Sequence, residues 1–225
     1  MPPASNTSTI ITIPTTGPTG ELLGFSGSIS TSISSAMFLP AAGVDSILLS
    51  MADYNKLYTP GDLGNFMVNT VIEIPEKSIL KIEYNREKCV FELDRVEPAI
   101  FAKPANYGFI PGTRDDDGDE LDTLVVSPEP IPTGVMLEAR ILGVLNFEDE
   151  GEKDHKIICV PADDRDSGNR IKSLDDLGEQ WKNKVEYHFN TYKDLKKRGT
   201  TKVLGYGGRD EALAVIKECV ERYST

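Results

Sequence analysis

Carboxylic acids fill one short stretch in the middle of the chain. Six of the eight residues from 115 to 122 are Asp or Glu, and the two exceptions are Gly118 and Leu121. So many like charges in one loop repel each other unless cations neutralise them. Ligands that are all oxygen atoms favour a hard divalent ion such as Mg²⁺, Mn²⁺ or Ca²⁺. The stretch therefore predicts a metal site, against the common alternative of an acidic surface loop that binds nothing specific.

The spacing of these acids does not match an EF-hand. An EF-hand loop needs oxygen ligands at positions 1, 3 and 5, Gly at position 6 and Glu at position 12. Counting from the first acid of the stretch puts Glu at position 6 and Val at position 12, and no other start does better. What remains is the segment 117–122, in which we expect Leu121 to point into the core. Asp117, Asp119 and Asp122 are then expected to converge outside it.

A second acidic cluster, residues 148–156, and several cationic side chains accompany this loop. Alone, the cluster is typical of a solvated hairpin tip. Together, two carboxylate stretches are able to hold several hard cations. Fixed positive charge and hydroxyl donors come from elsewhere in the chain: Lys81, Arg95, Lys156, Lys193, Tyr107 and Tyr192. A site that combines many metal ligands with several cationic side chains suits a highly charged phosphate.

Short strands are expected before two helices. Runs rich in β-branched residues predict strands at 71–74, 79–84, 89–93, 123–126, 135–144 and 156–160. Strands this closely spaced indicate a small barrel or a strongly bent antiparallel sheet. Residues 106–112, rich in aromatic residues, Gly and Pro, are interpreted as a turn that leaves the core. Within the second strand, Lys81 and Glu83 are two residues apart and therefore face the same way.

Both predicted helices lie in the last third of the chain. Ser173 is a suitable cap for the first, which is expected to end before Gly199. The second begins near Asp210 and carries apolar residues at helical spacing as far as Tyr223.

Composition disfavours several classes of protein. The net charge of −12 argues against binding nucleic acid by neutralising its phosphates. No run of 18 apolar residues occurs, so no membrane span is expected. The three cysteines are scattered and show neither metal spacing nor a disulfide framework. That usage fits a reducing compartment and predicts a cytoplasmic protein.

Residues 1–50 differ from the rest of the chain. They contain no Lys or Arg, and 17 of the 50 are Ser or Thr. This composition predicts a flexible extension in residues 1–50 and a folded domain in residues 51–225. Because the extension has neither a basic start nor an Arg-rich pattern, targeting is disfavoured as its role.

The order of the motifs resembles that of family I soluble inorganic pyrophosphatases of the compact bacterial type. The resemblance extends over about residues 55–222. Its segments are Glu73-Ile74-Pro75, Lys81-Ile82-Glu83, Asp94-Arg95, Asn106-Tyr107-Gly108-Phe109, Asp117-Gly118-Asp119-Glu120-Leu121-Asp122, Asp149 with Asp154-His155-Lys156, and Tyr192-Lys193-Asp194-Leu195. The chain departs from the family pattern in two places. Lys103 stands where the family usually has an aromatic residue, and Glu120 where it usually has Pro.

The resemblance implies a fold and an activity. The fold is α+β and mainly β: a five-stranded, OB-like β-barrel flanked by two helices. The activity is hydrolysis of pyrophosphate to two phosphates by a metal-activated water. Several Mg²⁺ ions per site are implied, with Mn²⁺ or Zn²⁺ as substitutes. Self-association is also implied, commonly to a hexamer.

The resemblance also implies a role for each motif residue. The implied metal ligands are Asp117, Asp122, Asp149, Asp154 and Glu83. The implied substrate-binding residues are Lys81, Arg95, Tyr107, Lys156, Tyr192 and Lys193. Asp119 orients or deprotonates the attacking water, and Asp117, Asp122 and Asp154 complete the catalytic set. Glu73 is expected to lie behind these residues.

Two other functions stay open from the sequence. The first is an OB-like module that binds a partner and has lost the chemistry. The second is a hydrolase that acts mainly on longer polyphosphates or on nucleotides.

Overall fold

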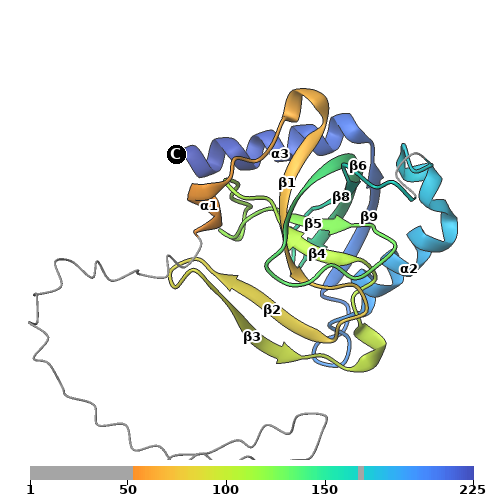
Figure 1. The fold of residues 1–225 in the computed structure, drawn as a ribbon. Helices are drawn as coiled ribbons and strands as arrows, with labels where there is room; N and C mark the ends of the chain where they lie inside the picture. Colours follow the sequence, from red (N-terminus) through yellow and green to blue (C-terminus); the bar gives the residue numbers. More distant parts are fainter. Residues whose placement is uncertain (1–52, 167–169) are drawn as a thin grey trace, which may run out of the picture. The chain divides into compact units, whose positions relative to one another are not determined.

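Five strands of the protein close into a ring (Figure 1). The computed structural model describes residues 53–166 and 170–225, so the extension predicted at residues 1–50 lies outside the described residues. In order around the ring, the strands are β1 (Met67–Ile74), β4 (Asn106–Phe109), β5 (Asp122–Val125), β8 (Lys156–Pro161) and β6 (Met136–Asp149). Strand β6 pairs back with β1, which closes the barrel. The ring pairings are antiparallel except that of β5 with β8, which is parallel. The predicted five-stranded barrel is confirmed.

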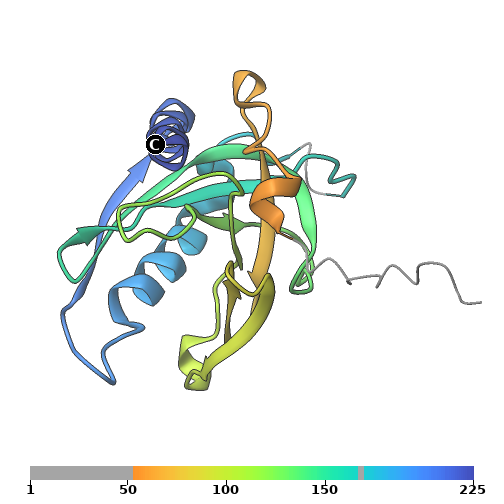
Figure 2. The same cartoon turned by 90° about the vertical axis from the view of Figure 1, so that its left-hand side faces the viewer.

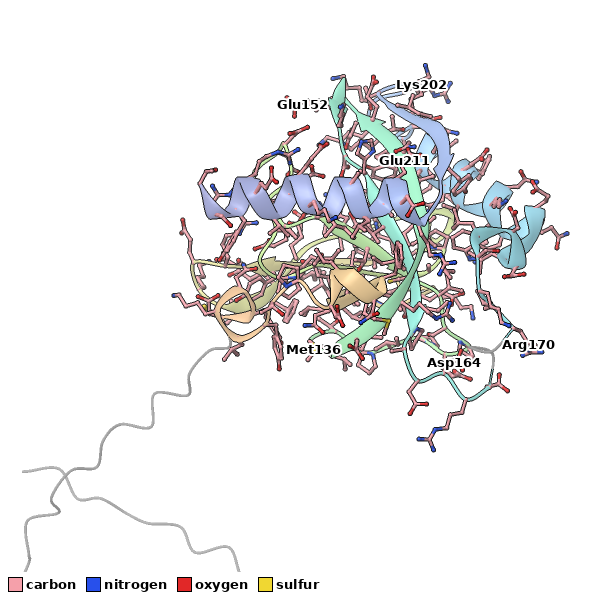
Figure 3. All side chains as sticks on the ribbon, turned by 90° about the horizontal axis from the view of Figure 1, so that it is seen from above. Met136, Glu152, Asp164, Arg170, Lys202 and Glu211 are labelled. Atoms are coloured by element: carbon pink, nitrogen blue, oxygen red, sulfur yellow. The ribbon has the colours of Figure 1, made fainter. Side chains whose placement is uncertain are left out.

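The remaining elements surround this ring. A separate hairpin is formed by β2 (Leu80–Asn85) and β3 (Val90–Val96), while β7 (Glu152–Lys153) and β9 (Thr201–Gly207) pair with β6. The helices are α1 (Tyr54–Leu57), α2 (Gly178–Thr191) and α3 (Arg209–Ser224), and short 3-10 turns occur at Leu63–Asn65, Ala99–Phe101 and Leu174–Leu177. Figure 3 shows α3 lying across the strands, with Met136 and Glu152 marking opposite ends of the β6–β7 hairpin.

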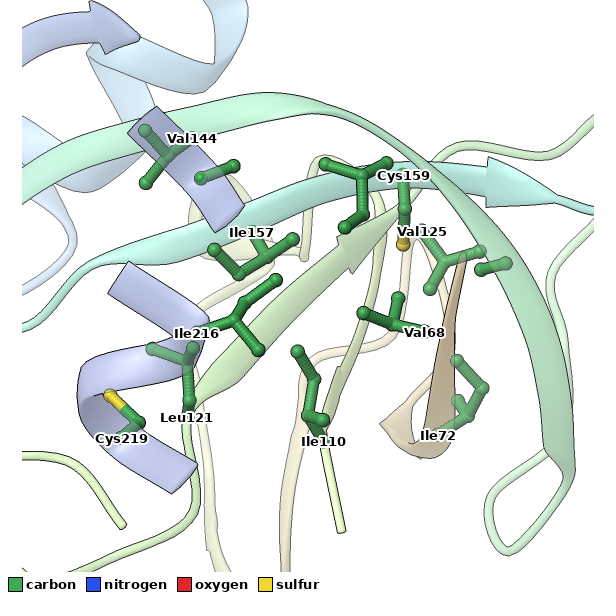
Figure 4. Close-up of a cluster of buried hydrophobic side chains, with 13 residues drawn as sticks. Val68, Ile72, Ile110, Leu121, Val125, Val144, Ile157, Cys159, Ile216 and Cys219 are labelled. Atoms are coloured by element: carbon green, nitrogen blue, oxygen red, sulfur yellow. The ribbon is translucent and has the colours of Figure 1, made fainter. Parts of the chain in front are cut away.

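Both faces of the central strands are buried, and this explains their apolar composition. In β8, Ile157 and Cys159 face the barrel interior, where Ile216 of α3 packs against the same cluster (Figure 4). The alternate residues Ile158 and Val160 belong to a second cluster that includes side chains of α2. Helices α2 and α3 thus cover opposite sides of the layer that contains β6, β8 and β9 (Figure 2). A strand covered on both faces is apolar at consecutive positions and not only at alternate ones.

The interpretation of residues 106–112 as a turn was wrong for the first four of them, which form β4. The buried Asn106 side chain accepts hydrogen bonds from the backbone N–H groups of Glu76 and Ile131, and its Nδ2 donates to Val125 and Ser127. Gly108 lets β1 approach closely, because a Cβ added there would lie 2.1 Å from the carbonyl oxygen of Val71. Asn and Gly, which are typical of turns, are therefore required here by a short strand that packs closely against its neighbours.

Two further expectations need correction. Strand β9 was not predicted. The first predicted helix is shorter than expected, since residues 174–177 form a 3-10 turn and α2 ends at Thr191, well before Gly199. Gly178, with a φ of 75°, interrupts the helical path after the 3-10 turn. The second predicted helix is confirmed as α3. Among the described helices, none has the length and apolar composition needed to cross a membrane.

Candidate active site

All twelve residues named above as metal-binding, catalytic or substrate-binding line one cleft of about 860 Å³. The β2–β3 hairpin contributes Lys81, Glu83 and Arg95, and the barrel and the loop before β5 contribute most of the others. Tyr192 and Lys193 directly follow the end of α2. The sequence motifs, separated by as many as 112 residues along the chain, therefore meet at one place in the fold.

The parallel pairing of β5 with β8 builds the centre of this cleft. Asp122, the first residue of β5, lies opposite Lys156, the first residue of β8. The ammonium of Lys156 donates hydrogen bonds to Oδ2 of Asp122 and to Oδ1 of Asp154. Only 2% of the Lys156 side chain is exposed. Burial opposes its charge, but the two carboxylates outweigh burial and raise the pKa of Lys156.

One ammonium does not compensate two half-buried carboxylates. Asp122 also accepts a hydrogen bond from the Tyr107 hydroxyl. Even so, burial raises the pKa of Asp122 to about 6, with repulsion from Asp154 acting in the same direction and Lys156 opposing both. Lys156, which is shared with a second acid, does not offset the effect of burial on this pKa. This part of the cleft keeps an excess of negative charge that a further cation would neutralise.

A second polar cluster surrounds Asp149 at the end of β6. Its Oδ2 accepts a hydrogen bond of 3.1 Å from the Tyr192 hydroxyl and one of 2.5 Å from Nζ of Lys193. Its Oδ1 is buried and has no hydrogen-bond partner among the described residues. Leaving a buried carboxylate oxygen unpaired is costly, so the atom is well suited to bind a cation.

The acidic loop is held in shape by its own hydrogen bonds. The hydroxyl of Thr113 donates to the carbonyl of Ile110 at 2.5 Å and accepts from the N–H of Leu121 at 2.9 Å. The carboxylate of Asp117 accepts from the N–H of Asp119 at 2.9 Å. Leu121 is fully buried, as expected, while the Asp119 side chain is 71% exposed. The loop thus buries Leu121 and leaves Asp119 on the outside.

The start of this loop is attached to helix α3. The N–H of Arg114 donates to the carbonyl of Cys219 at 2.9 Å. In return, Nη1 of Arg222 donates to the carbonyl of Arg114 at 2.9 Å and lies 3.4 Å from the carboxylate of Asp115. Residues from the last turns of the chain therefore support the first residues of the acidic loop.

Arg86 contacts the acidic loop, and the sequence motifs did not reveal this. Its guanidinium lies 2.7 Å from Oδ1 of Asp119 and 2.8 Å from Oε2 of Glu120, and it donates to the carbonyl of Gly118 at 3.1 Å. Glu120, whose side chain is 7% exposed, also accepts a hydrogen bond from Asn55. The pair therefore clamps the loop to the end of β2. The unusual acid at position 120 was a signal of this contact, but nothing in the sequence indicated its partner.

The remaining predicted residues pair with each other on the hairpin. Lys81 forms ion pairs with Glu83 and, at 3.4 Å, with Asp94. Arg95 lies opposite Lys81 in the strand register and forms a 2.6 Å ion pair with Asp94. Behind them, Glu73 accepts a hydrogen bond from the N–H of Tyr84 at 2.8 Å. Burial first, and repulsion by Asp122 second, raise the pKa of Glu73 to about 8.

The cleft has the chemistry of a divalent-metal site, although internal cations contact many of its acids. Within residues 53–166 and 170–225, no three His, Cys, Asp or Glu side chains are grouped as a metal-binding set. Lys156, Arg86 and Lys193 pair with the carboxylates instead. Burial raises the pKa of Asp117, and repulsion by Asp119 and Asp154 adds to it. These oxygen donors, with the unpaired Oδ1 of Asp149, fit a hard divalent ion.

Comparison with known proteins agrees with this geometry. A protein-family model described as inorganic pyrophosphatase matches residues 70–224. The chain belongs to the inorganic pyrophosphatase family. It is 59% identical over 174 residues to the inorganic pyrophosphatase of Neisseria meningitidis serogroup B, covering 77% of this chain and 98% of the relative. The inorganic pyrophosphatase of Haemophilus influenzae is 56% identical over 174 residues, which cover 77% of this chain and 99% of that protein.

Solved structures agree with the family assignment. The crystal structure of an inorganic pyrophosphatase from Neisseria gonorrhoeae matches with a TM-score of 0.75 and 58% identity, covering 76% of this chain and 99% of that one. The structure of the Thermus thermophilus inorganic pyrophosphatase matches with a TM-score of 0.70 at 39% identity, covering 75% and 97%. The resemblance to a compact bacterial pyrophosphatase, and the OB-like barrel that it implied, are confirmed.

The raised pKa of Glu73 predicts a pH-dependent stability for this pyrophosphatase. Between its ordinary value of 4.5 and about 8, the folded protein binds a proton that the unfolded chain releases. The contribution of Glu73 is therefore fully present below pH 4.5 and is lost as the pH rises through about 8. We expect the free energy of unfolding of Glu73→Gln, measured in EDTA, to rise relative to that of wild type as the pH increases. Between pH 5 and pH 9 this difference should change by more than about 1 kcal/mol.

Chemical denaturation at each pH measures this difference. Gln keeps an oxygen that accepts the Tyr84 N–H, so the variant changes the charge and little else. Glu129→Gln, at an exposed position, is the matched control. A constant difference between Glu73→Gln and wild type from pH 5 to pH 9 would contradict the prediction.

The clamp between Arg86 and Glu120 predicts a second effect. Arg86→Ala leaves a buried carboxylate whose remaining side-chain partner is Asn55. We expect a loss of about 2 kcal/mol in the free energy of unfolding, because a buried acceptor loses its charged donor. The double variant Arg86→Ala, Glu120→Gln should recover part of that loss, since Gln removes the uncompensated charge.

Calorimetric unfolding of wild type, Arg86→Ala and the double variant tests the clamp. Arg165→Ala is the control, because its ion pair with Asp163 is largely exposed and should contribute little. If Arg86→Ala were as stable as Arg165→Ala, the clamp would have no role in holding the loop.

Proposed function

We propose that this protein is a metal-dependent hydrolase that cleaves inorganic pyrophosphate to two phosphates. The observation that supports this most strongly is the convergence of twelve residues from distant motifs on one cleft with uncompensated acids. The relatives at 56% and 59% identity are named inorganic pyrophosphatase and are matched over nearly their whole length. Neither observation favours an OB-like module that has lost its chemistry.

Five acids of the cleft are proposed as ligands of divalent metal, with Mg²⁺ as the ion and Mn²⁺ or Zn²⁺ as substitutes. Asp117, Asp122 and Asp154 would hold a first ion, Asp149 with Asp154 a further one, and Glu83 another. Bound Mg²⁺ supplies Lewis acidity, which lowers the pKa of a coordinated water from about 15.7 towards neutrality and offsets phosphate charge. The unpaired Oδ1 of Asp149 and the raised pKa of Asp122 support this assignment.

The cationic side chains would hold the two phosphates. Lys81 pairs with Glu83 and Lys193 with Asp149, both proposed metal ligands, while Arg95 pairs with Asp94. If Glu83 and Asp149 bind metal, Lys81 and Lys193 become available for phosphate oxygens, which form strong charge-assisted hydrogen bonds. Lys156 and the hydroxyls of Tyr107 and Tyr192 complete this set as proposed substrate-binding residues.

Asp119 is the proposed group that orients or deprotonates the attacking water. Its side chain is 71% exposed, and the contact of its Oδ1 with Arg86 holds it in position. Since it is not a proposed metal ligand, its Oδ2 would accept a proton from a water within hydrogen-bond reach.

Domain organisation and location are further proposals. We propose that residues 51–225 contain the whole catalytic domain, since the family match at 70–224 lies within them. The three cysteines are not paired in disulfides, which supports a cytoplasmic location.

Phosphate release from pyrophosphate tests the function. With Mg²⁺, the full chain and a chain that begins at Met51 should both turn over, and EDTA should abolish the activity. Asp122→Asn and Asp119→Asn should each lower kcat at least about 100-fold, because a metal ligand and a proton acceptor are removed.

Asp163→Asn is the control for these variants, because that carboxylate is exposed and pairs only with Arg165 among the described contacts. Tripolyphosphate and ATP are compared as substrates to test the alternative of a polyphosphate or nucleotide hydrolase. Faster release from either of them than from pyrophosphate, or wild-type kcat in both active-site variants, would rule out the proposed function.

Self-association, as a hexamer, is proposed from the exposed apolar side chains beside the hairpin. Leu93, Val96 and Ile100 are 57%, 59% and 73% exposed. Burying such residues between copies is favourable by about 1.5–3 kcal/mol per large side chain. Sedimentation velocity should show an oligomer, and Ile100→Asp should shift it towards smaller species, whereas Lys202→Asp, on β9, should not. A wild-type monomer at micromolar concentration would contradict this.

A further inference from the structure

Lys103 is a cation in the wall of the cleft that none of the roles above uses. Its backbone is fixed on both sides, because its N–H donates to the carbonyl of Ser78 and its own carbonyl accepts from the N–H of Lys77. Its ammonium lies 4.2 Å from the ring centre of Tyr107 and 5.9 Å from that of Tyr192. Both rings belong to proposed substrate-binding residues, so the ammonium stands between two groups that would contact phosphate.

Lys103 differs from most other cations in the cleft because no carboxylate among the described residues pairs with it. Other cleft cations pair with carboxylates in the structure: Lys81, Arg86, Arg95, Lys156, Lys193 and Lys197. In the part of the chain that the structure describes, Lys103 has no carboxylate within 4.0 Å; its contacts are the two tyrosine rings. Lys196 also lacks an ion pair there, but its side chain is exposed to solvent. Lys103 is half-buried, so water compensates its charge less well.

The groups around Lys103 do not neutralise it. Burial first, and repulsion by Lys156 second, lower the pKa of Lys103 to about 8, against the attraction of the more distant Asp122. His188, which stacks on Tyr192 at a centroid distance of 5.8 Å, is held neutral because burial lowers its pKa to about 3. A half-buried ammonium with only aromatic rings as neighbours gains most from an anion that arrives from outside.

We propose that Lys103 is an additional substrate-binding residue of this chain, whose ammonium binds an oxygen of a phosphate group of pyrophosphate beside Tyr107 and Tyr192. The proposal rests on the proposed function of the same cleft. Because Lys103 has no carboxylate to release, its contact forms on substrate binding without breaking an internal ion pair. Its effect should therefore fall on ground-state affinity, and so on KM more than on kcat.

The experiment compares three variants of the full chain with wild type in Mg²⁺. Lys103→Gln removes the charge, Lys103→Arg keeps it, and Lys196→Gln removes an exposed charge that lines the same cleft. We expect Lys103→Gln to raise KM for pyrophosphate about tenfold with kcat within about twofold of wild type. Lys196→Gln should leave KM within about twofold, because solvent screens its charge. Lys103→Arg should recover most of the affinity.

Two further measurements separate binding from a structural role. Thermal unfolding without substrate should show no loss of Tm in Lys103→Gln, since the lysine forms no ion pair that stabilises the fold. Calorimetric titration with inorganic phosphate and Mg²⁺ should show weaker binding to Lys103→Gln than to Lys196→Gln. A cation–π contact that only positions Tyr107 would instead lower kcat and Tm together.

Several results would overturn the proposal. The first is an unchanged KM in Lys103→Gln. The second is a rise in KM for Lys196→Gln that equals the rise for Lys103→Gln. The third is a KM for Lys103→Arg as high as that for Lys103→Gln. The failure of the proposed function is distinguishable from these results, because it would appear as absent pyrophosphate hydrolysis in the wild-type protein.

Discussion

The cleft depends on one pairing, the parallel alignment of β5 with β8. That register sets Asp122 beside Lys156 and brings Asp154 to the same ammonium. Two acids then share one buried cation, and the remaining negative charge is what makes a divalent ion favourable there. A shift of one residue would turn Asp122 towards the opposite face and place an apolar neighbour at the centre of the site. The two buried faces of these strands resist such a shift, because each face fills its own cluster.

The internal ion pairs have a second role besides stability. In the described protein, Lys156, Arg86 and Lys193 occupy carboxylates that are proposed to serve metal and catalysis. This arrangement keeps a strongly acidic cleft folded before any ion binds. Under the proposed function, metal would replace the contacts of Lys156 and Lys193 with their carboxylates, and these two cations would then contact phosphate oxygens. Lys103 stands apart from this exchange because it has no carboxylate to lose.

Much of this site was predictable because its residues recur in short motifs whose types match their chemistry. The acids of segment 117–122, the Lys-x-Glu pair and the Tyr-Lys pair are recognisable in the sequence alone, and all of them line the cleft. The barrel was predictable from strand patterns, yet β4 was not, since a buried asparagine and a crowded glycine have the composition of a turn. Arg86 was missed because its partners are 33 and 34 residues away, a distance that no local pattern encodes.

The attachment of the acidic loop to helix α3 has a consequence for synthesis of the protein. Arg114 exchanges backbone and side-chain hydrogen bonds with Cys219 and Arg222, which are translated more than 100 residues after it. A nascent chain that has already emerged as far as β8 still lacks both contacts at the start of the loop. Its carboxylates are then without this anchor until α3 has been synthesised. Assembly of the acidic loop is thus coupled to the appearance of α3.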